Sequence, residues 1–408
     1  MQLSLFDCLP EKVKPGTQPS QLQGTELAEV FEAYFDCRST KRNTMNAIGF
    51  EVDYESNLIE LCNEINNGTY QPGKSIAFIV NKPVKREIFA ADFRDRVVHH
   101  LIINKLNPYF ECQFIFDSYA CRTGKGTHFG IQRIERFIRQ CSLNYSRDCY
   151  ILKLDIQGFF MHINKHILFN RLNTFISQNY QEPDLTLIVE LCSKVIYNDC
   201  IKNCVIKGSR RNWNGLPSSK SLFHSPENCG LPIGNLTSQI FANFYLNIFD
   251  HFIKHDLGIR YYGRYVDDFV LVHHDKEYLK SLIPIITGFL SSNLNLTLHP
   301  KKVYLQHFSK GVKFLGAVIM PHRIYIANRT KGNFYTAIQR QNEIVRHHKP
   351  TKEDRMKFIS SMNSYLGIMK HYKSYKLRKN MIFKLLSCWW WNHVYLTGGI
   401  AKFATKPK

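Results

Sequence analysis

Apolar residues recur at two different periods along the chain, and together they predict a mixture of helices and strands. Residues 53–72 carry Leu58 and Leu61 at helical spacing and end in an Asn-Gly stop signal. Residues 75–91 predict two strands around a basic turn, and residues 92–110 predict a helix with one apolar face. Because helices are interspersed with antiparallel strands, the expected fold class is α+β.

The same patterns continue to the C-terminus. They predict helices over 25–37, 126–141, 237–256 and 276–292, and strands over 149–155, 296–306 and 312–320. Residues 198–229 are basic, contain Ser, Asn and Pro, and predict an irregular insertion. Two basic helices are expected to close the chain, the second capped by Thr351 with Asp354 three residues on.

Composition narrows the class of protein. A hydrophobic content of 44% and an aromatic content of 13% indicate a globular chain rather than a disordered one. With no apolar run of roughly 18 residues and no signal-peptide pattern, we expect a cytoplasmic protein with no membrane partner. The cysteines form no CxxC pair, Cys200 and Cys204 coming closest, so reduced thiols are favoured over a zinc site.

The positive charge is concentrated near the C-terminus. The formal net charge is +21, and residues 301–408 hold 22 Lys and Arg against three acidic residues, a net of +19. The other 300 residues therefore carry 32 basic and 30 acidic side chains, a net of +2. This concentration indicates a surface for a polyanion such as nucleic acid.

Three aspartates stand where strands end. In "RYYGRYVDDFVLVHH", Asp267 and Asp268 separate two runs of strand-forming residues, although aspartate is a poor strand residue. Asp155 ends the predicted strand in "LKLDIQGFF". An isolated Asp-Asp turn is usually an ordinary exposed hairpin tip. Carboxylates at the ends of neighbouring strands, however, suit two-metal nucleotidyl transfer, because Mg²⁺ needs only one or two of them.

Over residues 50–385 the sequence resembles the reverse transcriptases. The resemblance rests on "YVDD", "LKLDIQGFF", "GLPIGNLTSQ", "LNLTLHPKKVYL" and "KFLGAVI", which occur in the family's order. It implies a right-hand polymerase with fingers, palm and thumb. The expected domains are an N-terminal extension (1–45), fingers with part of the palm (46–150), palm (151–322, including the insertion 198–229), thumb (323–385) and a C-terminal tail (386–408).

Several stretches are most similar to the reverse transcriptases of diversity-generating retroelements: "REIFAADFRDRVVHHLI", "DSYACRTGKGTH", "PSSKSLF" and "IGNLTSQ". Group II intron and retron-type enzymes usually place Gln where this chain has Ile233, and end the motif in Ser-Pro rather than Ser238-Gln239. The resemblance implies an enzyme that copies a template-repeat RNA with errors at adenines, so that the cDNA rewrites a variable gene. It also implies a small basic accessory variability protein, expected to be oligomeric, as a partner.

The resemblance assigns the reaction chemistry to few residues. Asp155, Asp267 and Asp268, with the backbone carbonyl of Ile156, are expected to hold two Mg²⁺ ions, for which Mn²⁺ can substitute. Lys302, with Lys301 as its alternative, is expected to protonate the pyrophosphate leaving group.

Other residues are expected to hold the dNTP. Arg86 matches the fingers arginine that contacts the base and phosphates, and Lys85 or Lys82 could assist, although a solvated turn explains either lysine equally well. Strand alternation after Asp155 should turn only one of Phe159 and Phe160 inward, and Phe160 is interpreted as the gate against a 2′-hydroxyl. Ile233 and Gly234 are expected to lie next to the nucleotide. Because the Ile233 side chain cannot form a hydrogen bond there, lower copying fidelity is predicted. The alternative is that Ile233 only packs under the turn at Gly234.

A last set of residues is expected to contact primer and template, the RNA–cDNA hybrid. It comprises Tyr265, Val266 and Gln239, the predicted primer grip Phe314, Leu315 and Gly316, and the thumb residues Lys370 and Lys373. The run Trp389–Trp391 is expected in a core or an interface. The basic insertion either touches RNA or is a flexible solvated loop.

Two other functions stay open on the sequence. The same chemistry could serve an antiphage-defence, retron or intron-derived enzyme, and gene neighbourhood would distinguish these from a retroelement. A non-catalytic RNA-binding scaffold is the second, and the presence of all three aspartates argues against it.

Overall fold

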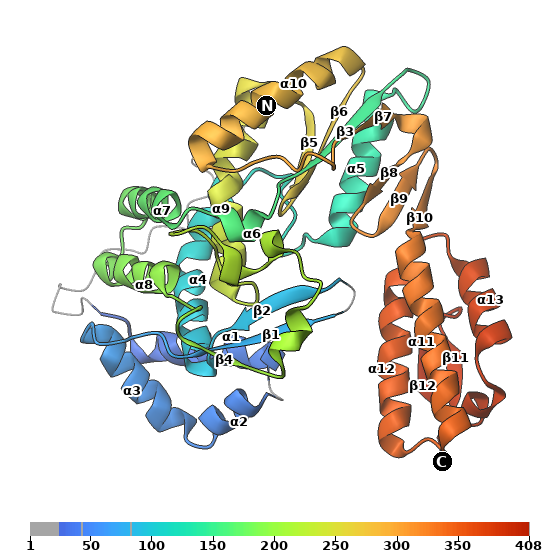
Figure 1. The fold of residues 1–408 in the computed structure, drawn as a ribbon, viewed down its shortest axis with the longest axis horizontal. Helices are drawn as coiled ribbons and strands as arrows, with labels where there is room; N and C mark the ends of the chain where they lie inside the picture. The colour runs from blue at the N-terminus through green and yellow to red at the C-terminus, as the bar shows by residue number, and fades with distance from the viewer. Residues whose placement is uncertain (1–23, 42–43, 82–83, 408) are drawn as a thin grey trace, which may run out of the picture. The chain divides into compact units, whose positions relative to one another are not determined.

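The computed structural model describes residues 24–41, 44–81 and 84–407 (Figure 1). The chain divides into two compact units, one of residues 1–122, 155–258 and 284–300, the other of residues 123–154, 259–283 and 301–408. Lys82 lies outside the described residues. Among the described residues, each helix is too short or too polar to span a lipid bilayer.

Helices form most of the first unit. They are α1 (Leu27–Lys41), α2 (Met45–Glu51), α3 (Tyr54–Asn66), α4 (Phe93–Gln113), α6 (Phe159–His162), α7 (Lys165–Asn179), α8 (Leu185–Tyr197) and α9 (Leu236–His251). The predicted helix over 92–110 is α4, which begins where the Asp92 carboxylate accepts a hydrogen bond from the Arg94 amide. It is buried along much of its length because it packs against both α1 and α9.

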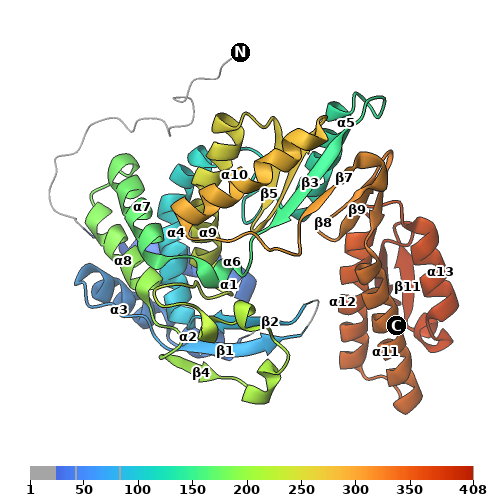
Figure 2. The ribbon, with the colours of Figure 1, turned by 45° about the horizontal axis from the view of Figure 1, so that its top comes forward.

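A three-stranded sheet, β2-β1-β4, completes this unit. The predicted strand pair is β1 (Ser75–Val80) and β2 (Arg86–Ala90), which are antiparallel. The third strand, β4 (Cys204–Ile206), pairs in parallel with β1 and comes from the insertion (Figure 2). The prediction that residues 198–229 are irregular throughout is therefore wrong. Sheet pairing with a strand over 120 residues away leaves no local periodicity to detect.

A buried carboxylate fastens the insertion to this sheet. Glu87 in β2 is 1% exposed and accepts hydrogen bonds from Trp213 Nε1 (2.6 Å), Ser221 Oγ (2.7 Å) and the Leu222 amide (2.5 Å). Buried carboxylates are stable only when their oxygens are satisfied in this way. These bonds attach residues 213–222 of the insertion to the sheet, while much of the remaining insertion is exposed.

Replacing Glu87 by Gln is expected to loosen the insertion, because an amide keeps only one accepting oxygen. Hydrogen bonds to a charged group are worth about 1.5–3 kcal/mol each, so a loss of stability of about that size is expected. Limited trypsin digestion at the exposed pair Arg210 and Arg211 should become faster. Glu227→Gln, at an exposed position in the same insertion, is the matched control and should leave the digestion rate unchanged.

The second unit contains a four-stranded sheet in the order β5-β6-β3-β7. Its strands are β3 (Tyr150–Asp155), β5 (Tyr261–Tyr265), β6 (Asp268–His273) and β7 (Tyr304–His307). Helix α5 (Thr127–Cys141) packs on β5 and β6 through a buried apolar stripe that includes Ile131 and Ile134. Helix α10 (Lys276–Leu294) begins in this unit and ends in the other.

One predicted strand ends as expected and another proves shorter. The strand predicted to end in Asp155 is β3, and Gly158, with a left-handed φ of 57°, precedes α6, which starts at Phe159. The strand predicted over 296–306 is reduced to β7, preceded by a loop with a single bridge from Leu298 to Ile156. The predicted α+β class itself is confirmed.

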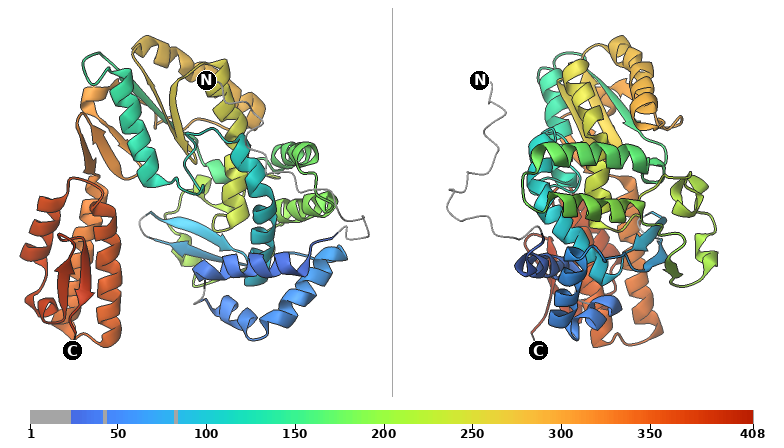
Figure 3. Two further views of the ribbon diagram at one scale, coloured as in Figure 1. Left: turned by 180° about the vertical axis from the view of Figure 1, so that it is seen from behind. Right: turned by 90° about the vertical axis from the view of Figure 1, so that its left-hand side faces the viewer.

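The C-terminal part of the second unit contains residues 323–385, the predicted thumb. Strands β8 (Val312–Phe314), β9 (Ala317–Met320) and β10 (Arg323–Ile326) lead into α11 (Asn328–His347), α12 (Lys352–Met369) and α13 (Tyr375–Leu385) (Figure 3). A hairpin of β11 (Val394–Thr397) and β12 (Lys402–Thr405) follows. Three helices therefore occur in the thumb instead of the two predicted.

The residues predicted as a C-terminal tail share one apolar core with α11, α12 and α13. Asn363 in α12 bonds both backbone groups of Phe403 in β12, donating to its carbonyl at 2.9 Å and accepting from its amide at 2.7 Å. Trp390 is fully buried and stacks on Phe358, with ring centroids 4.1 Å apart. The expectation that the tryptophan run lies in a core holds for Trp390.

Candidate active site

The two adjacent aspartates lie at a tight and strained turn. Tyr265 pairs with Asp268 across β5 and β6, so Val266 and Asp267 alone make the turn. Val266 has φ +56°, in the left-handed region that a two-residue hairpin usually gives to glycine. For a β-branched residue this conformation costs on the order of 1–3 kcal/mol, and such strain is concentrated at functional sites.

A buried arginine supports this turn. Arg264 in β5 is 0% exposed, and its Nη1 donates a hydrogen bond to the Val266 carbonyl at 3.0 Å. This contact fixes the peptide between Val266 and Asp267. Sequence analysis did not single out Arg264, although a charged residue inside an apolar strand was the available signal.

A lysine supplies the positive charge beside Asp268. Lys153 lies in β3, the strand next to β6, and its Nζ is 2.9 Å from Asp268 Oδ2. The same ammonium lies 5.9 Å from the ring centroid of Phe314, the first residue of the predicted primer grip. Lys153 thus neutralises part of the charge on this carboxylate. The sequence motif contains Lys153, but its pairing across strands was not predicted.

Asp155 stands at the C-terminal end of β3. Its backbone carbonyl accepts a hydrogen bond from the His299 amide at 2.8 Å, and Ile156 bridges to Leu298. Within the described ranges, no group of three or more His, Cys, Asp or Glu side chains is close enough to share one metal ion. Asp155 belongs to the first unit, whereas Asp267 and Asp268 belong to the second, so metal binding by these three carboxylates stays a prediction.

The predicted nucleotide-binding residues of the first unit come together around a loop. The Phe89 amide donates to the Ile233 carbonyl at 2.9 Å, and the Leu231 amide donates to the Phe160 carbonyl at 2.8 Å. Phe160 and Ile233 pack against the same apolar cluster, which includes Phe89. Three segments distant in sequence therefore form one surface.

Gly234 is required by the close packing of this loop. Its φ is +129°, and a Cβ there would lie 2.8 Å from Ile88 Cγ2 in β2. Any side chain would push the loop away from the strand, so only glycine suits this position.

Of the two phenylalanines after Asp155, only Phe160 is partly exposed. Phe159 is 2% exposed, and its ring meets that of Phe160 edge-on with centroids 5.5 Å apart. The expected cause, alternation along a strand, is wrong because both residues lie in α6. Phe160 stays the predicted gate against ribonucleotides, because it is the partly exposed residue of the two.

The fingers cations differ in their surroundings. Arg86 is the exposed first residue of β2. Lys85 Nζ donates to the Asn214 carbonyl at 2.6 Å, which ties Lys85 to the insertion. Arg86 is therefore the better placed of the two to meet a triphosphate.

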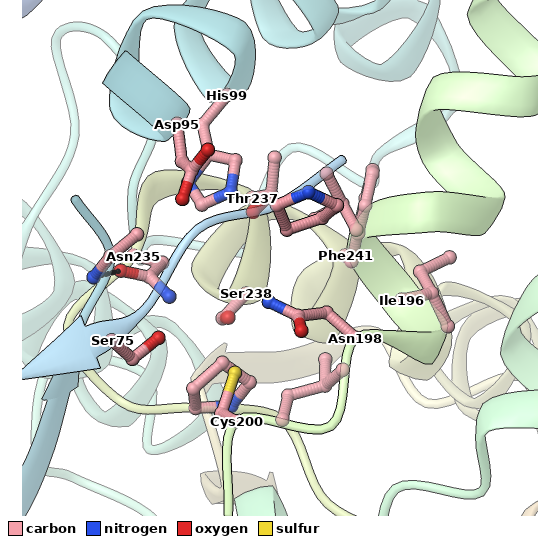
Figure 4. Close-up of a pocket in the computed structure, with 15 residues that line it drawn as sticks. Ser75, Asp95, His99, Ile196, Asn198, Cys200, Asn235, Thr237, Ser238 and Phe241 are labelled. Atoms are coloured by element: carbon pink, nitrogen blue, oxygen red, sulfur yellow. Dashed lines mark hydrogen bonds between the residues drawn. The ribbon is translucent and has the colours of Figure 1, made fainter. Parts of the chain in front are cut away.

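A small cavity with a mixed polar and apolar lining lies next to the loop of Leu231 and Pro232 (Figure 4). His99, Asp95, Asn235 and Thr237 contribute to its lining. Burial lowers the pKa of His99 to about 3 and raises the pKa of Asp95 to about 6. The cavity measures about 10 Å³, which is room for about one water molecule. It is too small to hold a nucleotide.

The other predicted contacts are spread over both units. Leu315 (φ +48°) and Gly316 (φ +84°) form the two-residue turn between β8 and β9, after the buried Phe314. Cys121 Sγ donates to Gln239 Oε1 in α9 at 2.8 Å. The three lysines expected to contact substrate or hybrid are exposed: Lys302 before β7, Lys370 at the end of α12, and Lys373.

Comparison with known proteins identifies the family. Residues 81–319, more than half of the chain, match the family described as reverse transcriptase (RNA-dependent DNA polymerase). The chain belongs to the reverse transcriptase family. The matched segment contains Asp155, Asp267 and Asp268, and enzymes of this family use divalent metal ions. The predicted family and right-hand polymerase fold are confirmed.

Individual relatives are distant. Protein YkfC of Escherichia coli (strain K12) is 22% identical over 293 residues, which cover 63% of this chain and 69% of that protein. Telomerase from Candida albicans, solved with a fragment of telomeric RNA, has a TM-score of 0.45 at 12% identity over 78% of this chain. Apo telomerase from Candida tropicalis, truncated from its C-terminal domain, has a TM-score of 0.44 at 14% identity over 67%. The chain covers 59% and 60% of these telomerase chains, less than two thirds of either.

Proposed function

We propose that the protein is an RNA-directed DNA polymerase that makes cDNA from a template-repeat RNA, with errors concentrated at adenines. The observation that carries the polymerase activity is the strained turn that presents Asp267 beside Asp268, inside the segment matched to the family. Stored strain is maintained where function requires one backbone geometry. Template RNA, the RNA–cDNA hybrid and dNTPs are the proposed substrates.

The proposed chemistry divides among a few side chains. Asp155 and Asp267 would hold two Mg²⁺ ions, with Asp268 contributing, and these ions supply charge neutralisation for nucleotidyl transfer. Arg86 binds the triphosphate and orients it, while Lys302 donates a proton to the departing pyrophosphate. Arg264 holds the turn in place through the Val266 carbonyl.

Phe160 is proposed to exclude ribonucleotides by filling the space of a 2′-hydroxyl. Phe160→Ala should lower the preference for dCTP over CTP by about 10- to 200-fold, the range that one small group in an apolar pocket provides. The measurement is the ratio of kcat/KM for the two nucleotides.

Phe223→Ala is the matched control, because Phe223 packs against the same apolar cluster from the insertion. It should weaken packing and leave the nucleotide preference unchanged. Equal loss of preference in both variants would show that Phe160 acts only through packing.

Ile233 is proposed to lower fidelity at adenines, since an aliphatic side chain selects by shape alone. Ile233→Gln should reduce errors opposite template adenine by about tenfold, the lower end of what one polar contact adds. Sequencing of cDNA made on one RNA template measures this. Ile233→Leu keeps an apolar side chain and should retain the wild-type error spectrum.

The error spectrum also separates the proposed setting from its alternatives. Errors concentrated opposite adenine support a diversity-generating retroelement, in which a small basic accessory variability protein and a structured RNA act as partners. Accurate cDNA would favour an antiphage-defence, retron or intron-derived enzyme. Failure to extend any primer with the cognate RNA and accessory protein present would favour an RNA-binding scaffold.

A further inference from the structure

One face of α13 is exposed along its whole length. Its exposed residues form adjacent pairs that recur every three or four residues and thus share a face: Tyr375, Lys376, Lys379, Asn380, Phe383 and Lys384. The opposite face, with Met381 and Ile382, is buried in the thumb core. Helices α12 and α13 lie on either side of α11 (Figures 1 and 2).

An exposed aromatic ring on this face is held rigidly. Phe383 is 55% exposed, and its ring stacks on Trp391, with centroids 5.2 Å apart and an interplanar angle of 10°. Trp391 in turn packs against Phe403 of β12, at 6.0 Å between centroids. A ring that is supported from behind and exposed in front costs little entropy when a second ring stacks on it.

Lysines flank Phe383 in sequence, and acidic residues are absent from this part of the sequence. Residues 355–408 contain 11 Lys and Arg and neither Asp nor Glu. The three acids of the region lie in α11 (Glu343) and in the first turn of α12, where Glu353 pairs with Lys357 at 2.7 Å and Asp354 caps the helix. The lysines of α13 are therefore available for an external anion.

We propose that this face of α13 binds an unpaired stretch of RNA. A base stacks on Phe383, and Lys376, Lys379 and Lys384 contact the phosphates on either side. Lysine is depleted in protein–protein interfaces, whereas lysines around an exposed aromatic ring are typical of single-strand binding surfaces. The proposal rests on RNA being the template, and it adds a second RNA contact outside the turn that carries Asp267.

The lysines are tested by a charge-matched comparison. One variant carries Lys376→Gln, Lys379→Gln and Lys384→Gln, and the control carries Lys349→Gln, Lys352→Gln and Lys357→Gln, which are also exposed thumb lysines. The probe is a fluorescein-labelled unstructured RNA, titrated at several salt concentrations. The α13 variant should reduce the slope of log K against log salt by about 2, since each phosphate contact contributes about 0.7.

The ring is tested separately. Phe383→Leu should weaken binding of the same RNA about fivefold, the lower end of base–aromatic stacking because only one face of the ring is open. Phe383→Tyr keeps the ring and should bind like the wild type. Thermal unfolding of both variants should match the wild type, because the side chain is largely exposed.

The outcomes separate this proposal from the proposed function. Extension of a preformed RNA–DNA template-primer by the α13 variants, together with their loss of single-strand RNA binding, supports the second site. The proposal would be overturned if the triple substitutions in α13 and in the control weakened RNA binding equally. It would also be overturned if the α13 variant bound RNA like the wild type, a result that would favour a protein as the partner of this face. If the variants lose affinity for a DNA strand of the same sequence and not for RNA, the occupant is product DNA and the RNA proposal fails. Absence of extension by the wild type counts against the polymerase alone.

Discussion

Replacing Asp267 by Asn is expected to abolish primer extension, with a loss of about 10³-fold or more. Removing a preorganised charged group from a reaction centre typically costs about 10²–10³-fold, and this carboxylate is also expected to hold metal. Asparagine tolerates the tight turn after Val266, so the hairpin itself should persist. Extension of a DNA primer on an RNA template, followed by gel electrophoresis, measures the loss.

Asp275→Asn is the control for this prediction. Asp275 caps α10 by accepting hydrogen bonds from the amides of Glu277 (2.8 Å) and Tyr278 (3.1 Å), and asparagine caps a helix equally well. It removes the same charge eight residues away and should leave extension near the wild-type rate. Similar losses in both variants would mean that net charge, rather than the metal-binding role of Asp267, sets the rate.

Trp390→Ala is expected to destabilise the thumb by about 3–5 kcal/mol, the usual cost of removing a large aromatic side chain from a core. Trp390 is fully buried, stacks on Phe358 and donates from Nε1 to the Gln341 carbonyl at 3.3 Å. Its loss leaves a cavity between α11, α12 and the C-terminal hairpin. Urea unfolding followed by circular dichroism should show a lower midpoint.

The neighbouring tryptophan provides the comparison. Trp389 is only partly buried and meets Trp390 edge-on, so Trp389→Ala should cost clearly less. If the two substitutions proved equally mild, residues 388–405 would not belong to the thumb core. That result would favour the C-terminal tail predicted from sequence.

Local patterns in the sequence predicted the elements that are determined locally. Helix α5 follows from the apolar spacing of Ile131 and Ile134, and the cap of α12 follows from Thr351 and Asp354. The turn at Asp267 was identifiable because two acids interrupt an apolar hairpin. Motif order along the chain then indicated the family, which the match over 81–319 confirms.

Features that depend on distant partners could not be predicted in this way. The insertion becomes ordered through Glu87, and the C-terminal hairpin is held by Asn363; neither contact leaves a periodic signal. The ion pair between Lys153 and Asp268 requires β3 to lie next to β6, which only the sheet order reveals. The environment of Phe160 was misattributed because the helical turn set by Gly158 depends on one backbone angle.

This chain is expected to polymerise DNA on an RNA template. The most direct measurement is extension of a labelled DNA primer by the purified protein on a defined RNA, with dNTPs and Mg²⁺, supplied with its cognate RNA and accessory protein where these are needed. The account predicts full-length cDNA that is absent with Asp267→Asn, and errors in that cDNA concentrated opposite adenine. Absence of cDNA from the wild-type protein under all of these conditions, with binding of RNA retained, would contradict it.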